Sequence, residues 1–311
     1  MRSSVNGTLF HLRSFLSYHI GRSFTDHSLI VYKNDDPLVL LPAAEMDIDG
    51  TRQLVSHPGA SFGGFVHRGI SYSDADQMAS LITEYCIQQD FHRIFIVPTP
   101  QIYYPEPDET LDYTLSRHGY ETVEYYIASV IFLNRPWEKI QAEICHRKNR
   151  SQSYYEQIVE RYNIHFEWQP DFAAYYPILL DNKLRHNTMP THSLAELERL
   201  HELLPDSFQL LLMYSNDCLV GGTLNFVANP RAVIIFYNMM DHQYASLQPA
   251  TLQVMETIRW AQEKGFNALD FGVSQEPMAS DPLTPRPPLI RFKEELTGRG
   301  MIRKALAKSF V

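Results

Sequence analysis

The feature that most limits how this chain can fold is a weak internal repeat. In each half of the sequence, strand candidates precede an amphipathic helix, and a short apolar strand follows that helix. The helices are expected at 73–89 and 249–264, because apolar residues recur there at the spacing of one helical face. The strands that follow are expected at 94–97 and 268–271. The sequence therefore predicts the same supersecondary unit twice, with an offset of 175 residues.

Three antiparallel strands are predicted before each helix. Asn216-Asp217 and Asn229-Pro230 are typical hairpin turns between strands of the second set. The six strands are expected at 29–32, 38–46, 52–56, 208–214, 219–227 and 233–240.

The two halves are joined by a segment that predicts one long helix, at 136–161, with Pro136 in its first turn. We therefore expect a domain boundary near Asn134, with domains at 1–134 and 135–311. A later segment, 276–288, contains five prolines. Because proline lacks a backbone donor and fixes φ, this segment is expected to be a loop.

Composition excludes several classes of protein. The 311 residues carry a formal net charge of −9, which argues against a general nucleic-acid binder, and DNA is not an expected partner. Apolar stretches such as 38–44 and 128–133 are far shorter than the roughly 20 residues of a membrane helix. Cys86, Cys145 and Cys218 form no CxxC pair, which fits reduced thiols and a cytoplasmic location.

The order strand, strand, strand, helix, strand resembles the core of the GNAT acyltransferase fold. The segment 257–274, which includes Asp270-Phe271-Gly272 and Ser274, resembles the helix-to-strand signature of a GNAT subfamily related to the Fem-type peptidoglycan-bridge aminoacyltransferases. The motif Phe292-Lys293-Glu294 before a Gly-rich turn is similar to a second motif of that subfamily. The resemblance implies an α+β fold of two tandem GNAT-like domains, each with a mixed, largely antiparallel sheet flanked by helices.

Two further segments carry the resemblance. Arg185-His186, followed by Pro190 and His192-Ser193, is similar to a family segment, and so is the turn at 59–64. The resemblance thereby implies substrate-binding roles for Arg185, His186, Arg291, Gly63 and Gly64.

The reaction that the resemblance implies is N-acyl transfer. An acyl or aminoacyl group would move onto an amine of a cell-envelope or polysaccharide precursor. Acyl-CoA or aminoacyl-tRNA would be the co-substrate, and no permanently bound cofactor is expected. The segment 241–250 lacks the glycine-rich turn with which typical GNAT proteins bind a pyrophosphate, so the donor stays open. The alternative is a non-catalytic protein that binds a sugar-nucleotide or lipid-linked precursor.

Lys293 and Asp270 are the candidate catalytic residues. By resemblance, the Lys293 ammonium supports the negative charge that builds up during acyl transfer. The alternative is a surface lysine beside Glu294. Asp270 interrupts an apolar strand, and an unpaired buried carboxylate is costly. It is therefore expected either to cap the following loop or to act as a base.

A local basic patch lies on the linking helix. Arg147, Lys148 and Arg150 could bind a diphosphate or the backbone of a tRNA, which would make tRNA a partner. A solvated helix face paired with acidic neighbours is the alternative. Arg185 and His186 end a predicted helix, where cations also favour the helix dipole.

No metal site is expected. The spacing of His186, His192, Glu198 and His201 fits no common zinc pattern.

Overall fold

The computed structural model describes residues 3–276 and 279–310. The chain forms two compact units: unit 1 is Met1–Tyr126 with Ile302–Val311, and unit 2 is Ile127–Met301. These units differ from the predicted domains 1–134 and 135–311, because the last strand of the chain pairs with the strand at 93–96, within unit 1. Strands so distant in sequence leave no local signal of their pairing. Each unit is described separately below.

Unit 1 is built on a sheet with the strand order β1-β4-β5-β7-β14. A second sheet has the order β2-β3-β6. The strands are β1 (Thr25–Asp26), β2 (Leu29–Lys33), β3 (Asp36–Leu41), β4 (Ala44–Ile48), β5 (Thr51–Ser56), β6 (Val66–His67), β7 (Arg93–Ile96) and β14 (Arg299–Ser309). The helices are η1 (Leu9–His11), α1 (Arg13–Leu16), α2 (Tyr72–Gln88), η2 (Gln101–Tyr103) and α3 (Thr110–Arg117).

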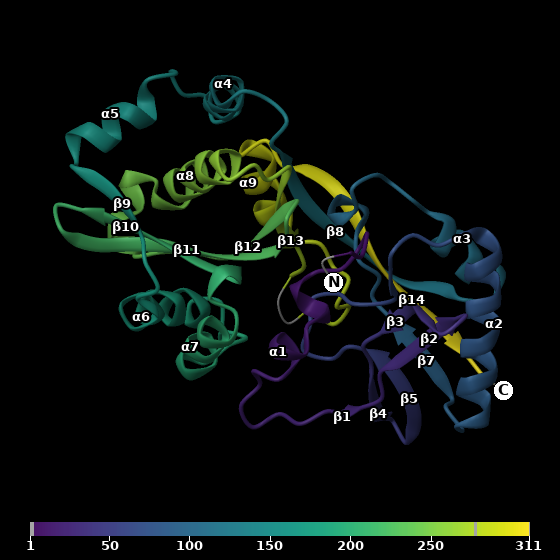
Figure 1. Ribbon diagram of the computed structural model, residues 1–311. Coiled ribbons are helices and arrows are strands. Elements are labelled where there is room, and N and C mark those ends of the chain that lie inside the picture. The colour runs from purple at the N-terminus through teal and green to yellow at the C-terminus, as the bar shows by residue number, and fades with distance from the viewer. Residues whose placement is uncertain (1–2, 277–278, 311) are drawn as a thin grey trace. The chain divides into compact units, whose positions relative to one another are not determined.

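Unit 2 has one sheet with the strand order β8-β13-β12-β11-β10-β9. Helix α8 covers one face of the sheet, and α6 and α7 lie on the other face (Figure 1). The strands are β8 (Glu121–Phe132), β9 (Ile164–Trp168), β10 (Phe208–Ser215), β11 (Cys218–Asn229), β12 (Ala232–Met240) and β13 (Ala268–Val273). The helices are α4 (Trp137–Arg147), α5 (Tyr154–Arg161), α6 (Phe172–Leu184), α7 (Leu194–Leu203), η3 (Pro205–Ser207), η4 (His242–Leu247), α8 (Pro249–Glu263) and α9 (Pro287–Glu295).

The predicted repeat is confirmed by the strand pairing. In unit 1, the β4–β5 hairpin leads through α2 to β7, which is parallel to β5. In unit 2, the β11–β12 hairpin leads through α8 to β13, which is parallel to β12. An antiparallel strand then pairs with the last strand of each set, β14 with β7 and β8 with β13. The chain is therefore an α+β protein with two copies of one core.

Local turn chemistry explains several boundaries. Asn216 and Asp217 both have positive φ, 46° and 65°, as a two-residue turn between β10 and β11 requires. Pro249 begins α8, where a missing backbone N–H costs nothing, and Gly265 follows that helix with φ 80°.

Three predicted elements are wrong in detail. The helix expected at 136–161 is two helices, α4 and α5, because Asn149 adopts φ 53° and the chain leaves the helix there. The strand expected at 38–46 is split between β3 and β4, which belong to different sheets. The proline-rich loop ends earlier than expected, because Pro287 and Pro288 start α9. Pro277 lies outside the described residues.

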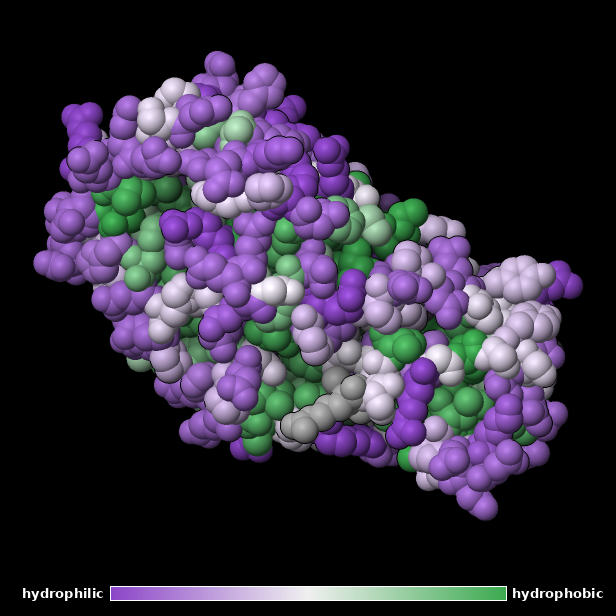
Figure 2. Space-filling view, turned by 45° about the horizontal axis from the view of Figure 1, so that its top comes forward, coloured by the Kyte–Doolittle hydropathy of each residue, from purple (hydrophilic) through white to green (hydrophobic). Residues whose placement is uncertain are grey.

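Each unit has its own apolar core. Ile94, Met78 and Leu54 are buried at the centre of unit 1, and Leu269 and Ile144 at the centre of unit 2. Figure 2 shows that, on the face it presents, hydrophobic residues are exposed in several separate groups among hydrophilic ones. Within 3–276 and 279–310, no helix combines the length and the apolar character needed to cross a membrane.

Candidate functional site

The parallel strands β12 and β13 separate soon after they meet. Their pairing joins only Ala232–Ile234 to Ala268–Asp270, while β12 continues to Met240. The pairing of β13 with β8 also shifts register between Asp270 and Val273. In the described part of the chain, β12 has no register partner in β13 beyond Ile234. Backbone groups at such an edge can pair with an extended ligand. Two carbonyls beyond Ile234, those of Tyr237 and Met240, accept side-chain hydrogen bonds from Tyr175 and Asn182.

Asp270 lies at the point of separation, with 6% of its surface exposed. Its Oδ1 accepts a hydrogen bond of 2.6 Å from the backbone N–H of Gly272. Gly272 has φ 64°, in the left-handed region that glycine adopts without strain. The Asp270 carboxylate therefore fixes the turn in which β13 leaves the sheet, which supports the capping role among its two expected roles.

Lys293 is buried, with 4% of its surface exposed, so the alternative of a surface lysine is wrong. Its Nζ donates to Ser274 Oγ at 2.7 Å. It also lies 3.0–3.1 Å from three backbone carbonyl oxygens, those of Phe271, Gly272 and Val273. An ammonium has three donors, and here it meets four acceptors in the described structure. Lys293 thereby attaches α9 to the end of β13.

A group of basic side chains lies near the carboxyl ends of β12 and β13. We call Lys183, His186, His242 and Arg286 the Arg286 cluster. Asn182 Nδ2 donates to the carbonyl of Met240 at 2.7 Å, which holds the end of α6 against the end of β12.

The Arg286 cluster also reaches β13. The backbone N–H of Arg286 donates to the Ser274 carbonyl at 3.0 Å, and Arg286 Nη2 lies 3.4 Å from His186 Nδ1. Burial and the nearby cations Arg286, Lys183 and His242 lower the pKa of His186. Burial, followed by the charge of Arg286, lowers the pKa of Lys183. Both shifts indicate that positive charge is crowded here, while the Glu276 carboxylate acts in the opposite direction on His186.

The start of the helical segment after β12 does not offer a phosphate site. Asp241 Oδ1 accepts from the backbone N–H of Gln243 at 2.9 Å, so a carboxylate already occupies the first turn of η4. Gln248 has φ 57° and precedes Pro249, which has no N–H to donate. The Arg286 cluster is therefore the better place for an anion in unit 2.

The other predicted basic residues are placed differently. Arg185 is exposed, and its Nε lies 2.7 Å from Asp181 Oδ2 in an (i, i+4) ion pair. Arg291 is exposed on α9. Of the predicted binding residues, only His186 belongs to the Arg286 cluster. Sequence reasoning missed Lys183, His242 and Arg286, although Arg286 lies in the proline-rich segment and Lys183 lies two residues before Arg185.

The predicted basic patch is largely engaged with the protein itself. Arg147 Nη2 lies 2.6 Å from Glu143 Oε1, and Lys148 Nζ lies 2.9 Å from Glu295 Oε2. The guanidinium carbon of Arg150 lies 4.6 Å from the centroid of the Tyr154 ring. A phosphate at this patch would have to compete with two carboxylates.

Gly63 and Gly64 already use their amides. Gly63 N donates to the Val97 carbonyl at 2.8 Å, and Gly64 N donates to Ser56 Oγ at 3.0 Å. Gly64 has φ 83°, and a Cβ there would lie 3.1 Å from Pro98 Cα. These glycines permit a close approach of two chain segments. The segments that follow β5 and β7 therefore remain hydrogen-bonded to each other, whereas β12 and β13 separate.

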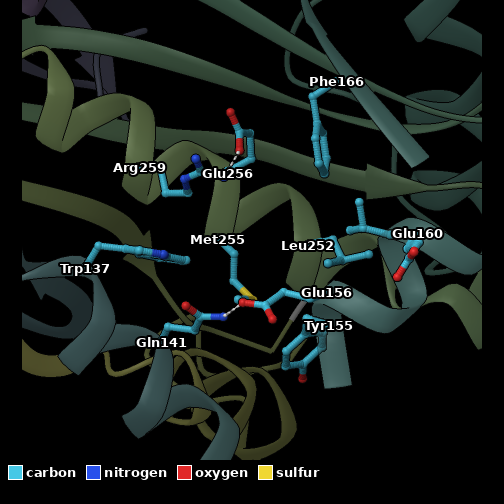
Figure 3. Close-up of a pocket in the computed structure, with 11 residues that line it drawn as sticks. Trp137, Gln141, Tyr155, Glu156, Glu160, Phe166, Leu252, Met255, Glu256 and Arg259 are labelled. Carbon is cyan, nitrogen blue, oxygen red and sulfur yellow. Dashed lines mark hydrogen bonds and ion pairs between the residues drawn. The ribbon is translucent and has the colours of Figure 1, made fainter. Parts of the chain in front are cut away.

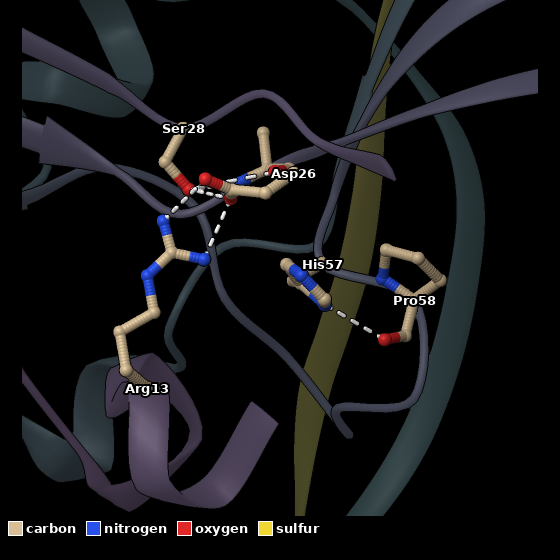
Figure 4. A network of polar contacts seen from close by, with 6 residues as sticks. Arg13, Asp26, Ser28, His57 and Pro58 are labelled. Carbon is tan, nitrogen blue, oxygen red and sulfur yellow. Dashed lines mark hydrogen bonds and ion pairs between the residues drawn. The ribbon is translucent and has the colours of Figure 1, made fainter. Parts of the chain in front are cut away.

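Unit 1 contains a pocket of about 260 Å³ beside β5, lined by charged, polar and apolar side chains. Arg13 donates to both carboxylate oxygens of Asp26, at 2.6 and 2.8 Å, and Ser28 Oγ donates to Asp26 Oδ1 at 2.8 Å (Figure 4). His57, directly after β5, lies 2.8 Å from the Pro58 carbonyl through Nδ1, and burial lowers the pKa of His57. Arg286 Nε also faces a carboxylate, Glu276 Oε2, but at 4.0 Å, whereas Arg13 lies 2.6 Å from Asp26. A carboxylate therefore competes with a bound anion more strongly in this pocket than at the Arg286 cluster.

Metal ligands do not gather in the described residues, which contain no group of three or more His, Cys, Asp or Glu side chains able to hold an ion.

Comparison with known proteins identifies the fold. Residues 147–280 match the family model of the acetyltransferase (GNAT) domain. None of the curated proteins compared with the chain matches it. The crystal structure of FemX aligns with a TM-score of 0.73 at 11% identity, covering 99% of this chain and 94% of that chain.

Two further solved structures share the fold at low identity. The structure of L-PGS from Bacillus licheniformis has a TM-score of 0.54 at 11% identity, covering 98% of this chain and 88% of that chain. A conserved protein of unknown function from Bacteroides thetaiotaomicron has a TM-score of 0.59 at 10% identity, covering 100% and 94%. Residues 147–280 thus match a GNAT domain, and the likeness of fold to FemX covers both units.

Proposed function

We propose that this protein is an N-acyltransferase, and that the transfer takes place in unit 2 where β12 and β13 separate. The observation that carries the proposal is that, among the described residues, β12 has no register partner in β13 after Ile234. An extended donor chain with amide groups can add to this edge as a further strand. The match of residues 147–280 to an acetyltransferase domain supports the same region.

The chemistry requires an attacking amine, a stabilised oxyanion and a leaving group. The amine nitrogen forms a bond to the acyl carbon, and the carbon–sulfur bond of a thioester or the carbon–oxygen bond of an aminoacyl ester breaks. The amine loses a proton, and this proton is transferred to the thiolate or alkoxide that leaves. Backbone N–H groups on the β12 edge are the donors that the developing oxyanion needs. Asp270 and Lys293 contribute by holding the end of β13 at a fixed distance from this edge.

In this proposal the Arg286 cluster binds a phosphate group of one of the substrates. Acyl-CoA and aminoacyl-tRNA both carry phosphates, and so do many activated cell-envelope precursors. The cluster provides a guanidinium and an ammonium, which are suitable partners for phosphate oxygens. We propose an amine of a cell-envelope or polysaccharide precursor as the acceptor, by analogy with the Fem-type resemblance.

The test is an acyl-transfer assay with the full chain. Acetyl-CoA and lysyl-tRNA are supplied in separate reactions with an amino-sugar and an amino-acid acceptor, and thiol release or tRNA deacylation is measured. We expect acceptor-dependent release from one donor, with a lower rate for Arg286→Gln. Arg199→Gln, an exposed position on α7, is the matched control and is expected to leave the rate unchanged.

A non-catalytic binding protein is the second candidate. It is favoured by the Asp241 carboxylate in the first turn of η4 and by the missing glycine-rich turn. Binding of UDP-N-acetylglucosamine, together with no release from either donor, would support this candidate and contradict acyl transfer.

A further inference from the structure

Unit 2 contains a pocket of about 340 Å³ beside α8. Helices α4, α5 and α8 and strand β9 line it (Figure 3). The side chains that line it are Trp137, Gln141, Tyr155, Glu156, Val159, Glu160, Phe166, Leu252, Met255, Glu256 and Arg259. The volume is at the lower end of the range for small-molecule sites, which fits a ligand of about one ring and a short chain.

The pocket uses another face of α8 than the one that contacts the sheet. Gln253 is fully buried, and a Cβ at Gly221 of β11 would collide with its amide. Leu252 and Met255, on either side of Gln253 in sequence, line the pocket instead. Helical spacing turns these side chains away from β11. The pocket is therefore distinct from the edge of β12 where we propose acyl transfer.

The interior of the pocket is apolar and aromatic. Leu252 and Met255 are 4% and 5% exposed, and Tyr155 is 2% exposed. Trp137 and Phe166 lie at opposite ends of the group, with Met255 between them (Figure 3). Aromatic faces attract both apolar groups and cations.

Trp137 already has a cation near its ring. The guanidinium carbon of Arg259 lies 6.0 Å from the Trp137 ring centroid. This distance is at the outer limit of a cation–π contact, so Arg259 already lies over the ring of Trp137.

The charged groups of the pocket are mainly acidic. Glu156, Glu160 and Glu256 contribute three carboxylates, against the single guanidinium of Arg259. Gln141 Nε2 donates to Glu156 Oε1 at 3.1 Å, and Arg259 Nη1 lies 3.6 Å from Glu256 Oε2. The net charge of the lining is therefore negative.

Glu256 is the most enclosed of the three carboxylates, with 24% of its side chain exposed. Burial raises its pKa; Arg259 acts in the opposite direction, and Glu263 adds to the increase. The ion pair with Arg259 thus offsets only part of the desolvation that raises the pKa of Glu256. A second cation in the pocket would stabilise the charged carboxylate further.

We propose that this pocket binds a small amphipathic organic cation, with its apolar body against Trp137, Phe166 and Met255 and its ammonium group near Glu256. Glu156 and Glu160 extend the negative charge toward the exposed rim. The combination of an aromatic interior and carboxylates favours an alkyl- or arylammonium ion over a neutral or anionic molecule of the same shape.

The experiment compares three probes that share a 2-phenylethyl body and differ in the charge of the end group. Binding of 2-phenylethylammonium, 2-phenylethanol and 3-phenylpropionate to the full chain is measured by isothermal titration calorimetry at pH 7. The cation is expected to bind about tenfold more tightly than the neutral probe. The anion is expected not to bind. Equal affinity for the cation and the alcohol would overturn the proposal, because the pocket would then select apolar shape alone.

Two substitutions locate the binding. Glu256→Gln and Glu160→Gln are each expected to weaken binding of the cation, the first by about tenfold. Glu202→Gln, an exposed position on α7 on the other face of the sheet, is the matched control and is expected to have no effect. Because Glu160 is exposed on α5, its variant keeps the test valid if Glu256→Gln does not fold. Unchanged affinity in both pocket variants would contradict the proposed site.

The measurement needs no acyl donor. Its outcome is therefore independent of whether the protein proves to be an acyltransferase.

Discussion

The ammonium nitrogen of Lys293 lies 2.7 Å from the hydroxyl oxygen of Ser274, a residue that directly follows β13. The same nitrogen is within 3.1 Å of three backbone carbonyls of Phe271–Val273. Lys293 is therefore a positioning residue for the end of β13, next to the separation from β12. Its buried contacts predict that Lys293→Ala lowers the stability of the fold as well as turnover.

Lys293→Met is expected to lower the free energy of unfolding by about 2–4 kcal/mol, since it leaves buried carbonyls without a donor. Urea unfolding measures the change. Lys264→Met, at an exposed position after α8, is the control and is expected to have a small effect. Lys293→Arg is expected to restore part of the loss, because the guanidinium keeps donors but is larger and planar. A Lys293→Met protein as stable as the parent would contradict the positioning role.

His11 makes the stability of unit 1 dependent on pH. Burial lowers the pKa of His11 to about 4, and its Nδ1 accepts from the backbone N–H of Thr8 at 3.0 Å. The folded state therefore binds fewer protons than the unfolded state between about pH 4 and pH 6.5. The stabilisation is complete above about pH 6.5 and is lost as the pH falls toward about 4, by up to about 3 kcal/mol.

The substitution His11→Gln tests this dependence. The variant is expected to lose less stability than the parent when the pH falls from 7 to 5. His92→Gln, at an exposed position, is expected to follow the parent. Parallel pH profiles for the parent and His11→Gln, measured by urea unfolding, would show that His11 is not the group responsible.

We expect the Arg286 cluster and the basic patch on α4 to differ in how much each contributes to anion binding. Arg286→Gln is expected to weaken binding of coenzyme A by about tenfold, because it removes a charge-assisted hydrogen bond to phosphate. Changing Arg147, Lys148 and Arg150 together to Gln is expected to have a smaller effect, because Glu143 and Glu295 already pair with two of them.

Calorimetry at two salt concentrations measures both variants. The Arg286→Gln protein is also expected to show a weaker dependence of affinity on salt. A larger loss of affinity in the triple variant would move the anion site to the basic patch.

Gly222 is expected to tolerate no side chain. A Cβ there would lie 2.8 Å from the carbonyl oxygen of Leu211 and 2.9 Å from Tyr175. Gly222→Ala is therefore expected to cost about 1–3 kcal/mol of stability. At Gly300 the nearest atom would be the end of the Ile127 side chain, at 3.2 Å, which can move. Thermal unfolding of the two alanine variants should show the larger loss for Gly222→Ala.

Part of the site could be predicted from the sequence because its signals are local. The α8–β13 segment was expected within a few residues of its bounds. The position of Asp270 in an apolar strand predicted either a cap or a base, and its hydrogen bond to Gly272 supports the cap. His186 was a candidate as a neighbour of Arg185 at the end of α6. The rest of the Arg286 cluster could not be predicted, because Lys183 and Arg286 meet only through the packing of α6 and the segment after β13.

The sequence by itself determined the repeated hairpin–helix–strand core, since apolar periodicity and turn residues act over a few neighbouring positions. The tertiary structure decided which strand closes each core, because β7 pairs with β14, more than 200 residues away, and β13 with the earlier strand β8. It also decided that Lys293 is buried, because its four acceptors come from the end of another element. Such contacts depend on the free energy of the whole folded chain, and no short stretch of sequence encodes them.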